Sequence, residues 1–251
     1  MALAGLAAVA VSVVAISAEA AAPKYGPRDI FDTWIGVGGM EGAAFKNEPW
    51  PTHPEFTEWG KAASDKAAST DTQLHECFPW TPAGFMGGNG LFPIQIMPAR
   101  NSIVMLYEAM VSPRRIYTDG RKHPPADEIL PTFLGHSIAH WEGDTLVIDT
   151  VGHNGQARPI NGYVSGAVNS GVETNPRLVA SDQLHVVERI RLVQNGTYLE
   201  DAITVEDPKV YKKGFTVKKY FQRRPELEFN EYVCDFNRRP DAEGQTDVAA
   251  Q

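Results

Sequence analysis

The chain is poor in cysteine and in positive charge. It has two cysteines, Cys77 and Cys234, and its 23 basic side chains are outnumbered by 31 acidic ones, which gives a net charge of −8. Nucleic-acid binding depends on basic side chains that neutralise phosphates, and anionic membrane surfaces likewise attract basic segments. The acidic balance therefore argues against nucleic acid and anionic lipid as partners.

Common catalytic and cofactor motifs are also absent from the sequence. There is no GxSxG elbow, no phosphate-binding P-loop and no dinucleotide fingerprint. Neither cysteine has another cysteine at the CxxC spacing of a metal site. We therefore expect no organic cofactor, and we assign no residue to a metal site.

Beyond the N-terminus, the sequence has no run that is long and apolar enough to span a membrane. Residues 1–16 are apolar and uncharged, and Ala18-x-Ala20 fits the small-residue cleavage rule of secretory signal peptides. We expect a signal peptide over residues 1–20, a periplasmic or secreted protein, and no membrane insertion after cleavage. An uncleaved membrane anchor is the alternative. In an exported chain the two cysteines indicate one disulfide, with two buried free thiols as the alternative.

The N-terminal part of the mature chain is predicted to be irregular and helical. Prolines interrupt residues 21–51, and Thr52-His-Pro-Glu55 resembles a capping box that opens a short helix through Ala68. The inner positions of this helix would be Phe56, Trp59 and Ala63. We expect residues 21–91 to pack on a second, β-rich part of a single domain.

From residue 92 onward, polar and apolar residues alternate as they do in β-strands. Many strands with few helices predict a mainly β fold, an antiparallel barrel-like sheet of lipocalin or calycin type over residues 92–240. A long loop over residues 155–182 would be a lid or disordered, and residues 241–251 a disordered tail. The expected strands or hairpins cover residues 92–98, 102–109, 114–118, 135–151, 184–206, 215–223 and 227–236.

The segment from Gly135 to His153 is the richest in potential chemistry. Gly143-Asp144 fits a two-residue type II′ turn, which sets Ile138 opposite Asp149 and gathers ionisable side chains on one face. Asp149 could orient His136 or His140 as a general base, these histidines could bind a metal with an acid, or the face could simply be solvated. On one strand the two histidines lie about 13 Å apart, which disfavours a shared metal. The ionisable set is His136, His140, Glu142, Asp149 and His153.

The second hairpin carries two acids on an apolar face. An Asn195-Gly196 type I′ turn sets Arg191 opposite Glu200 and places Glu188 and Asp201 among seven aliphatic side chains. This face is expected to point inward, where an ionised acid needs donors or a raised pKa. Each acid is therefore either a general acid or base, or a member of a buried ion pair with an arginine.

Arg114 and Arg115 lie on opposite faces of their predicted strand. If Arg115 and Tyr117 point inward, they could bind a carboxylate, a phenol or a developing oxyanion; a salt bridge to one of the inward acids is the alternative. His185 shares a mixed face with Arg189 and is expected to be exposed.

From Cys77 onward the chain resembles a widespread family of exported bacterial proteins that has no assigned activity. The resemblance implies export and a β-rich domain, and it brings no chemistry of its own. His140 and His153 depart from the family pattern, whereas His136, Glu142 and Asp149 fit it. The motifs that carry the resemblance are Arg114-Arg-Ile-Tyr-x-Asp-Gly-Arg121, Gly135-His-Ser-Ile-x-x-Trp-Glu-Gly-Asp-Thr-Leu-Val-Ile-Asp-Thr150, Leu184-His-Val-Val-Glu-Arg189 and Glu231-Tyr-Val-Cys234.

Together these patterns favour an exported, cofactor-independent acid/base enzyme, a lyase, isomerase or hydrolase, that acts on a small apolar or aromatic molecule in a barrel pocket. The alternatives are a lipocalin-like periplasmic carrier without catalysis and a structural or interaction module. The expected catalytic residues are His136 as proton acceptor, Asp149 as its orienting group, and Glu188 or Asp201 as the acid. The expected substrate-binding residues are Arg115, Tyr117, Trp141, His140 and His153.

Overall fold

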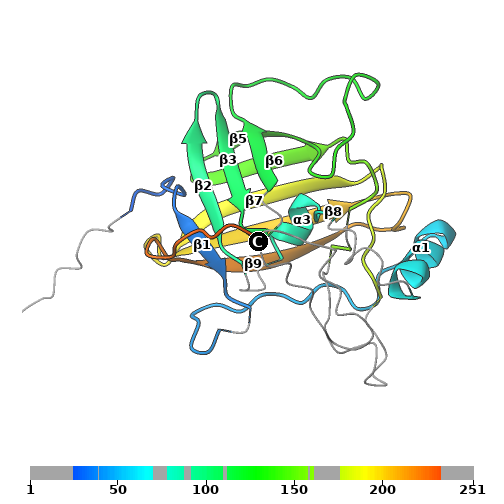
Figure 1. The fold of residues 1–251 in the computed structure, drawn as a ribbon, viewed down its shortest axis with the longest axis horizontal. Coiled ribbons are helices and arrows are strands. Elements are labelled where there is room, and N and C mark those ends of the chain that lie inside the picture. Colours follow the sequence, from blue (N-terminus) through cyan, green and yellow to red (C-terminus); the bar gives the residue numbers. More distant parts are fainter. Residues whose placement is uncertain are drawn as a thin grey trace, which may run out of the picture.

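Nine strands form one closed barrel in the computed structural model, which describes residues 25–38, 40–69, 78–87, 92–109, 112–157, 159–160 and 176–232. Each strand pairs with its neighbours in chain order, and β1 closes the circle by pairing with β2 and β9 (Figure 1). The expected mainly β, barrel-like fold is confirmed. The strands are β1 (Thr33–Gly36), β2 (Ile94–Ala99), β3 (Ser102–Tyr107), β4 (Ser112–Tyr117), β5 (His136–Glu142), β6 (Thr145–Val151), β7 (His185–Val193), β8 (Tyr198–Glu206) and β9 (Phe215–Arg223).

The barrel is not fully antiparallel, because β4 and β5 run in the same direction. In a strictly alternating sheet of nine strands, the first and last strands would be parallel where they meet. Here β1 and β9 meet antiparallel, and the change of direction falls at β4–β5. Parallel neighbours need a long crossover rather than a tight turn, and residues 118–135 provide it. The expectation of an antiparallel sheet is wrong at this one junction.

Both predicted hairpin registers are confirmed. Ile138 pairs with Asp149 across the first turn, where Gly143 has a φ of 57°, and Arg191 pairs with Glu200 across the second. A positive φ at the first central position is what a type II′ turn requires. The short turns and the period-two alternation were enough to set these pairings.

Two strand predictions are corrected. β1 was not expected, because its four buried residues are too few to show an alternation. Residues 227–232, the described part of the predicted last strand, form no strand. β9 already pairs with β8 on one side and with β1 on the other, so the closed barrel leaves the later residues no edge to extend.

The N-terminal helix begins later than predicted. α1 covers Glu58–Ser69, and the Oγ1 of Thr57, rather than that of Thr52, accepts a hydrogen bond from the Gly60 backbone N–H at 2.9 Å. Phe56 and Ala63 pack against the core as expected, but Trp59 is 46% exposed. Figure 1 shows α1 beside one end of the barrel.

The barrel interior is filled mainly by aliphatic side chains from all the longer strands. A short helix, α3 (Pro82–Phe85), packs against this core, and its Phe85 ring stacks on Tyr107 with centroids 4.2 Å apart. Within the described residues, no helix is long and apolar enough to cross a membrane. The predicted signal peptide, Cys77 and Cys234, residues 161–175 and the tail lie outside the described residues.

Candidate functional site

The barrel wall separates the two sets of acids and bases that the sequence suggested would converge. In the first hairpin the inward residues include Ser137, Ile148 and Thr150, which leaves His136 and Asp149 on the outer face. Ile148 pairs with Glu188 of β7, so that acid points inward. The prediction that the two histidine-hairpin residues share one cavity with Glu188 or Asp201 is therefore wrong.

The inward Glu188 forms a buried ion pair with Arg114. The guanidinium donates from Nη1 to Oε1 at 3.0 Å and from Nη2 to Oε2, and both side chains are almost completely buried. Arg114 also donates to the Ser137 and Thr150 hydroxyls at 3.1 and 2.8 Å. Glu188 is therefore a member of a buried ion pair with an arginine, one of the two roles that the sequence allowed. The pairing offsets the cost of burying its charge.

Asp201 is the second inward acid, and in the described part of the chain it lies in the core without a charged partner. It is fully buried, and neither carboxyl oxygen has a hydrogen-bond partner among the described residues. Burial raises the pKa of Asp201 well above its usual range, and the nearby negative charge of Glu188 raises it further. Its inward orientation is as expected, but this orientation keeps the carboxyl on the opposite side of the wall from His136.

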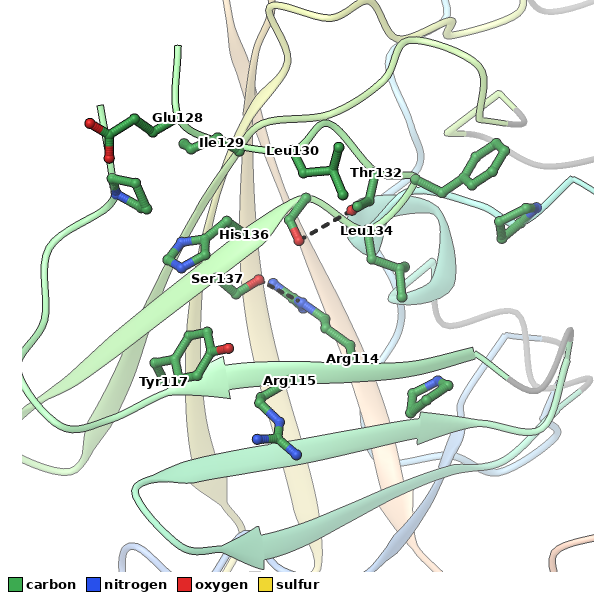
Figure 2. Close-up of a pocket in the computed structure, with 15 residues that line it drawn as sticks. Arg114, Arg115, Tyr117, Glu128, Ile129, Leu130, Thr132, Leu134, His136 and Ser137 are labelled. Atoms are coloured by element: carbon green, nitrogen blue, oxygen red, sulfur yellow. Dashed lines mark hydrogen bonds between the residues drawn. The ribbon is translucent and has the colours of Figure 1, made fainter. Parts of the chain in front are cut away.

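A pocket of about 520 Å³ lies at the parallel junction between β4 and β5. Only two residue pairs join these strands. The β4–β5 connection forms the opposite wall of the pocket. Figure 2 shows Tyr117 and His136 on one side of this space and Arg114 and Ser137 at its base. The apolar part of the lining comprises Pro79, Pro113, Pro124, Ile129, Leu130, Phe133 and Leu134.

His136 connects the pocket to a chain of polar side chains on the outer face. Its ring lies against Tyr117, with centroids 5.3 Å apart, and its Nδ1 is 2.8 Å from the Nδ1 of His123. The other nitrogen of His123, Nε2, is 3.0 Å from Oδ1 of Asp149. Burial lowers the pKa of His136, and the neighbouring His123 and Arg121 lower it further, which favours the neutral imidazole.

A second histidine, His185 on β7, contacts Asp149. His185 Nε2 lies 3.1 Å from Oδ1 of Asp149, and His185 Nδ1 lies 3.3 Å from Oε2 of Glu206. The hydrogen bond from His185 is the main reason that the pKa of Asp149 is lowered. The same bond raises the pKa of His185 despite its partial burial. The two groups thus stabilise each other in their charged forms.

The hydrogen-bond pattern determines the neutral tautomers of His123 and His136. An ionised Asp149 can only accept, so His123 donates its Nε2–H to it and keeps Nδ1 as an acceptor. His136 must then donate its Nδ1–H to His123. The Nε2 of neutral His136 therefore carries a free lone pair, which is the form that a general base requires.

The other residues expected at the site occupy different places. Tyr117 and Arg115 both lie on the outer face and line the pocket, so the expectation that they point into the barrel is wrong. Arg114 is the inward member of the arginine pair, because Arg114 and Ile116 are the buried, alternating residues of β4. Figure 2 shows the Arg115 side chain extending away from residues 128–134, whereas Tyr117 lies beside His136.

The three remaining candidates do not reach the pocket lining. His140 is exposed and bonds to Glu142 at 3.1 Å. His153 is buried, with its Nδ1 3.2 Å from the Phe133 carbonyl oxygen. Trp141 packs at the edge of the core beneath the guanidinium of Arg28. Within the described residues, no group of three or more histidines, cysteines or carboxylates is arranged to hold a metal ion.

Two important histidines were not identified from the sequence. His123 lies in the proline-containing β4–β5 connection, where no periodic pattern indicates its neighbours. His185 was expected to be exposed, but Asp149 pairs with Val187, two residues away on the same face of β7. A correct β6–β7 register would have identified that diagonal contact, since such neighbours lie within reach of long side chains.

A scan of the chain against protein-family models found no match, and a search of curated proteins found none either. The resemblance to exported bacterial proteins therefore stays a prediction that rests on the four quoted motifs.

Proposed function

We propose that this protein is an exported, cofactor-independent acid/base enzyme that acts on a small molecule in the pocket between β4 and β5. The observation that supports this best is the bonding of His136. The imidazole lines the pocket, and its Nδ1 is engaged by a His123–Asp149 pair that leaves Nε2 free to accept a proton. Base-catalysed lyase, isomerase and hydrolase reactions use such a proton transfer.

The lining indicates the kind of substrate. Prolines, aliphatic side chains and a phenylalanine form most of the wall, which favours a largely apolar or aromatic molecule. Tyr117 provides a phenol beside His136, and the Arg121 guanidinium lies 3.8 Å from the centroid of the Tyr117 ring. In this proposal Tyr117 binds an oxygen of the substrate while His136 removes a proton nearby. Glu188 and Asp201 have no part in the reaction, because they lie inside the wall.

The substrate can be sought without knowing the reaction. We expect a His136→Ala variant to retain substrate because the pocket walls remain while the base is lost. Mass spectrometry of small molecules co-purified with this variant should identify an apolar or aromatic compound. A compound that also co-purifies with a pocket-blocked Leu134→Trp variant would not be bound at this site.

The catalytic part of the proposal is tested by comparing two histidine variants. The compound identified, together with small apolar ketones and aromatic esters, is incubated in D₂O and followed by proton NMR for deuterium uptake or conversion. His136→Gln should slow turnover about 10²–10⁴-fold, which is the usual contribution of a general base. His140→Gln is the matched control, since His140 lies on the same face of β5 but outside the pocket. Equal rates for His136→Gln and the wild type would refute the base assignment.

A binding or carrier protein is the second candidate. The apolar lining and the cavity of about 520 Å³ are within the range of small-molecule sites, and Arg114 already neutralises Glu188 beside the pocket base. A carrier would bind the same compounds with equal affinity in the wild type and in His136→Gln. It would convert none of them in the D₂O experiment.

A further inference from the structure

Five ionisable side chains form a continuous hydrogen-bonded row along the outer face of the barrel. The row runs from β5 through the β4–β5 connection to β6, β7 and β8, and its successive contacts measure 2.8, 3.0, 3.1 and 3.3 Å. The strand pairings place the last members, since His185 lies directly opposite Glu206. In order, the row consists of His136, His123, Asp149, His185 and Glu206.

Exposure to solvent is lowest beside the pocket and highest at the far end of this row, with Asp149 and His185 intermediate. The His123 side chain is 19% exposed, Asp149 and His185 are 40% and 34% exposed, and Glu206 is 60% exposed. A proton that arrives at the pocket end therefore has sheltered neighbours, whereas one at the far end meets water. The row therefore runs from a sheltered end beside the pocket to an exposed end at Glu206.

We propose that these five side chains form a proton relay that connects the pocket base His136 to solvent at Glu206. His185 and Glu206 are positioning residues in this relay, because neither lines the pocket. The proposal rests on the proposed function only in taking His136 as the base. It adds the route by which the proton leaves.

Each transfer in the relay conserves protons. When His136 Nε2 gains a proton from the substrate, its Nδ1–H moves to Nδ1 of His123, and the Nε2–H of His123 moves to Asp149. Above the raised pKa of His185, where this ring is neutral and protonated at Nδ1, Asp149 passes a proton to Nε2 of His185 while the Nδ1–H moves to Glu206. One proton enters at His136 and one leaves from Glu206 to water, and each ring returns by rotation or by exchange with solvent.

Other charged and titratable groups lie near the relay. Arg121 and Tyr117 adjoin His136, and the charge of His185 lowers the pKa of the buried His153. On the same face His140, Glu142 and Arg189 form a separate group, joined by contacts of 3.1 and 2.8 Å. That group has no hydrogen bond to the relay among the described residues, so it provides matched controls.

The relay is tested by imidazole ¹⁵N NMR titration of histidine-labelled protein. In the wild type, the neutral His136 ring should be protonated at Nδ1, and the titrations of His136 and His185 should be coupled. His185→Gln removes the positive charge that His185 carries below its raised pKa, so the pKa of His136 should rise by about 0.5 unit or more. Glu206→Gln should lower the pKa of His185, and the His140→Gln control should change none of them.

A second measurement distinguishes proton conduction from electrostatic coupling alone. With a converted compound from the D₂O experiment, Glu206→Gln should turn over several-fold more slowly in dilute buffer, and added imidazole buffer should restore the rate. Glu206 is well exposed, so this variant should fold normally. A titration of His136 that is unchanged in both variants, or a slow rate that imidazole does not restore, would overturn the relay. Either result would leave the role of His136 itself intact, which the His136→Gln comparison decides separately.

Discussion

Two histidines with lowered pKa values show how the surroundings of a single residue decide its use. His136 opens onto the pocket and gives its Nδ1–H to His123, whereas His153 is closed off from water. The Nδ1–H of His153 donates to the Phe133 carbonyl, and its Nε2 has no partner among the described residues. Burial lowers the pKa of His153 to about 4, so this ring is a neutral structural group at physiological pH.

We predict that His153 makes the protein sensitive to acid. As the pH falls below about 6.5, the ordinary pKa, the unfolded state takes up a proton at this residue, but the folded state does not until about pH 4. The folded state should therefore lose about 2–3 kcal/mol between pH 7.5 and pH 4.5 through this ring. Urea unfolding at the two pH values should show that His153→Gln removes this loss and His140→Gln does not. An unchanged loss in His153→Gln would contradict the assignment.

At the scale of elements, the junction between the β4–β5 connection and β5 shapes the pocket. Gly135 has a φ of 68°, and a Cβ there would lie 2.6 Å from the Val151 carbonyl oxygen. This close approach lets Thr132 bridge to His153, with backbone bonds of 3.1 Å from Thr132 N–H to Gly152 O and 2.9 Å from Asn154 N–H to Thr132 O. The connection is thereby held against the end of β6, where its residues line the pocket.

Gly135→Ala and Gly143→Ala separate backbone conformation from packing. Both glycines have positive φ, but a Cβ at Gly143 would meet nothing within 4 Å. Gly143→Ala should cost about 1–2 kcal/mol, the penalty of the left-handed conformation alone. Gly135→Ala should cost about 1–3 kcal/mol more because of the clash, and it should weaken ligand binding in the pocket. Equal losses in urea unfolding would show that the connection yields without strain.

At the scale of the whole molecule, closure of the barrel depends on the short contact between β1 and β9. Arg223 spans this seam: its guanidinium bonds to Asp32 at 2.8 Å and to the backbone oxygens of Gly196 and Asp29. The guanidinium also lies over the rings of Tyr25 and Trp34, at 3.7 and 4.5 Å from their centroids. One buried side chain thus joins the first strand, the β7–β8 turn and the last strand.

Neighbouring arginines provide the test of the seam. Arg223→Ala leaves Asp32 and two backbone carbonyls without their donor, and it should lower the free energy of unfolding by about 3–5 kcal/mol. Arg224→Ala removes only a partly exposed pair with Glu226 and should cost less than about 1 kcal/mol. Chemical denaturation of both variants measures the difference. Similar small losses would show that the barrel closes without the guanidinium.

The sequence by itself determined the local β structure. Short glycine turns and strict alternation specify both hairpin registers and the inward face of Glu188 and Asp201, because these patterns depend only on neighbouring residues. They also place His136 and Asp149 on one face of the first hairpin. In the first hairpin both faces carry apolar residues, so alternation defines the two faces but does not say which one the barrel encloses.

Only the tertiary structure decided that His136 and Glu188 lie on opposite sides of the wall. It also placed His123 between His136 and Asp149, and it brought His185 to the other side of that carboxylate. These contacts depend on the curvature of the closed sheet, on the parallel β4–β5 junction and on a long crossover without periodicity. Such features arise from residues far apart in the chain, which is why local patterns indicated the histidine site but not its partners.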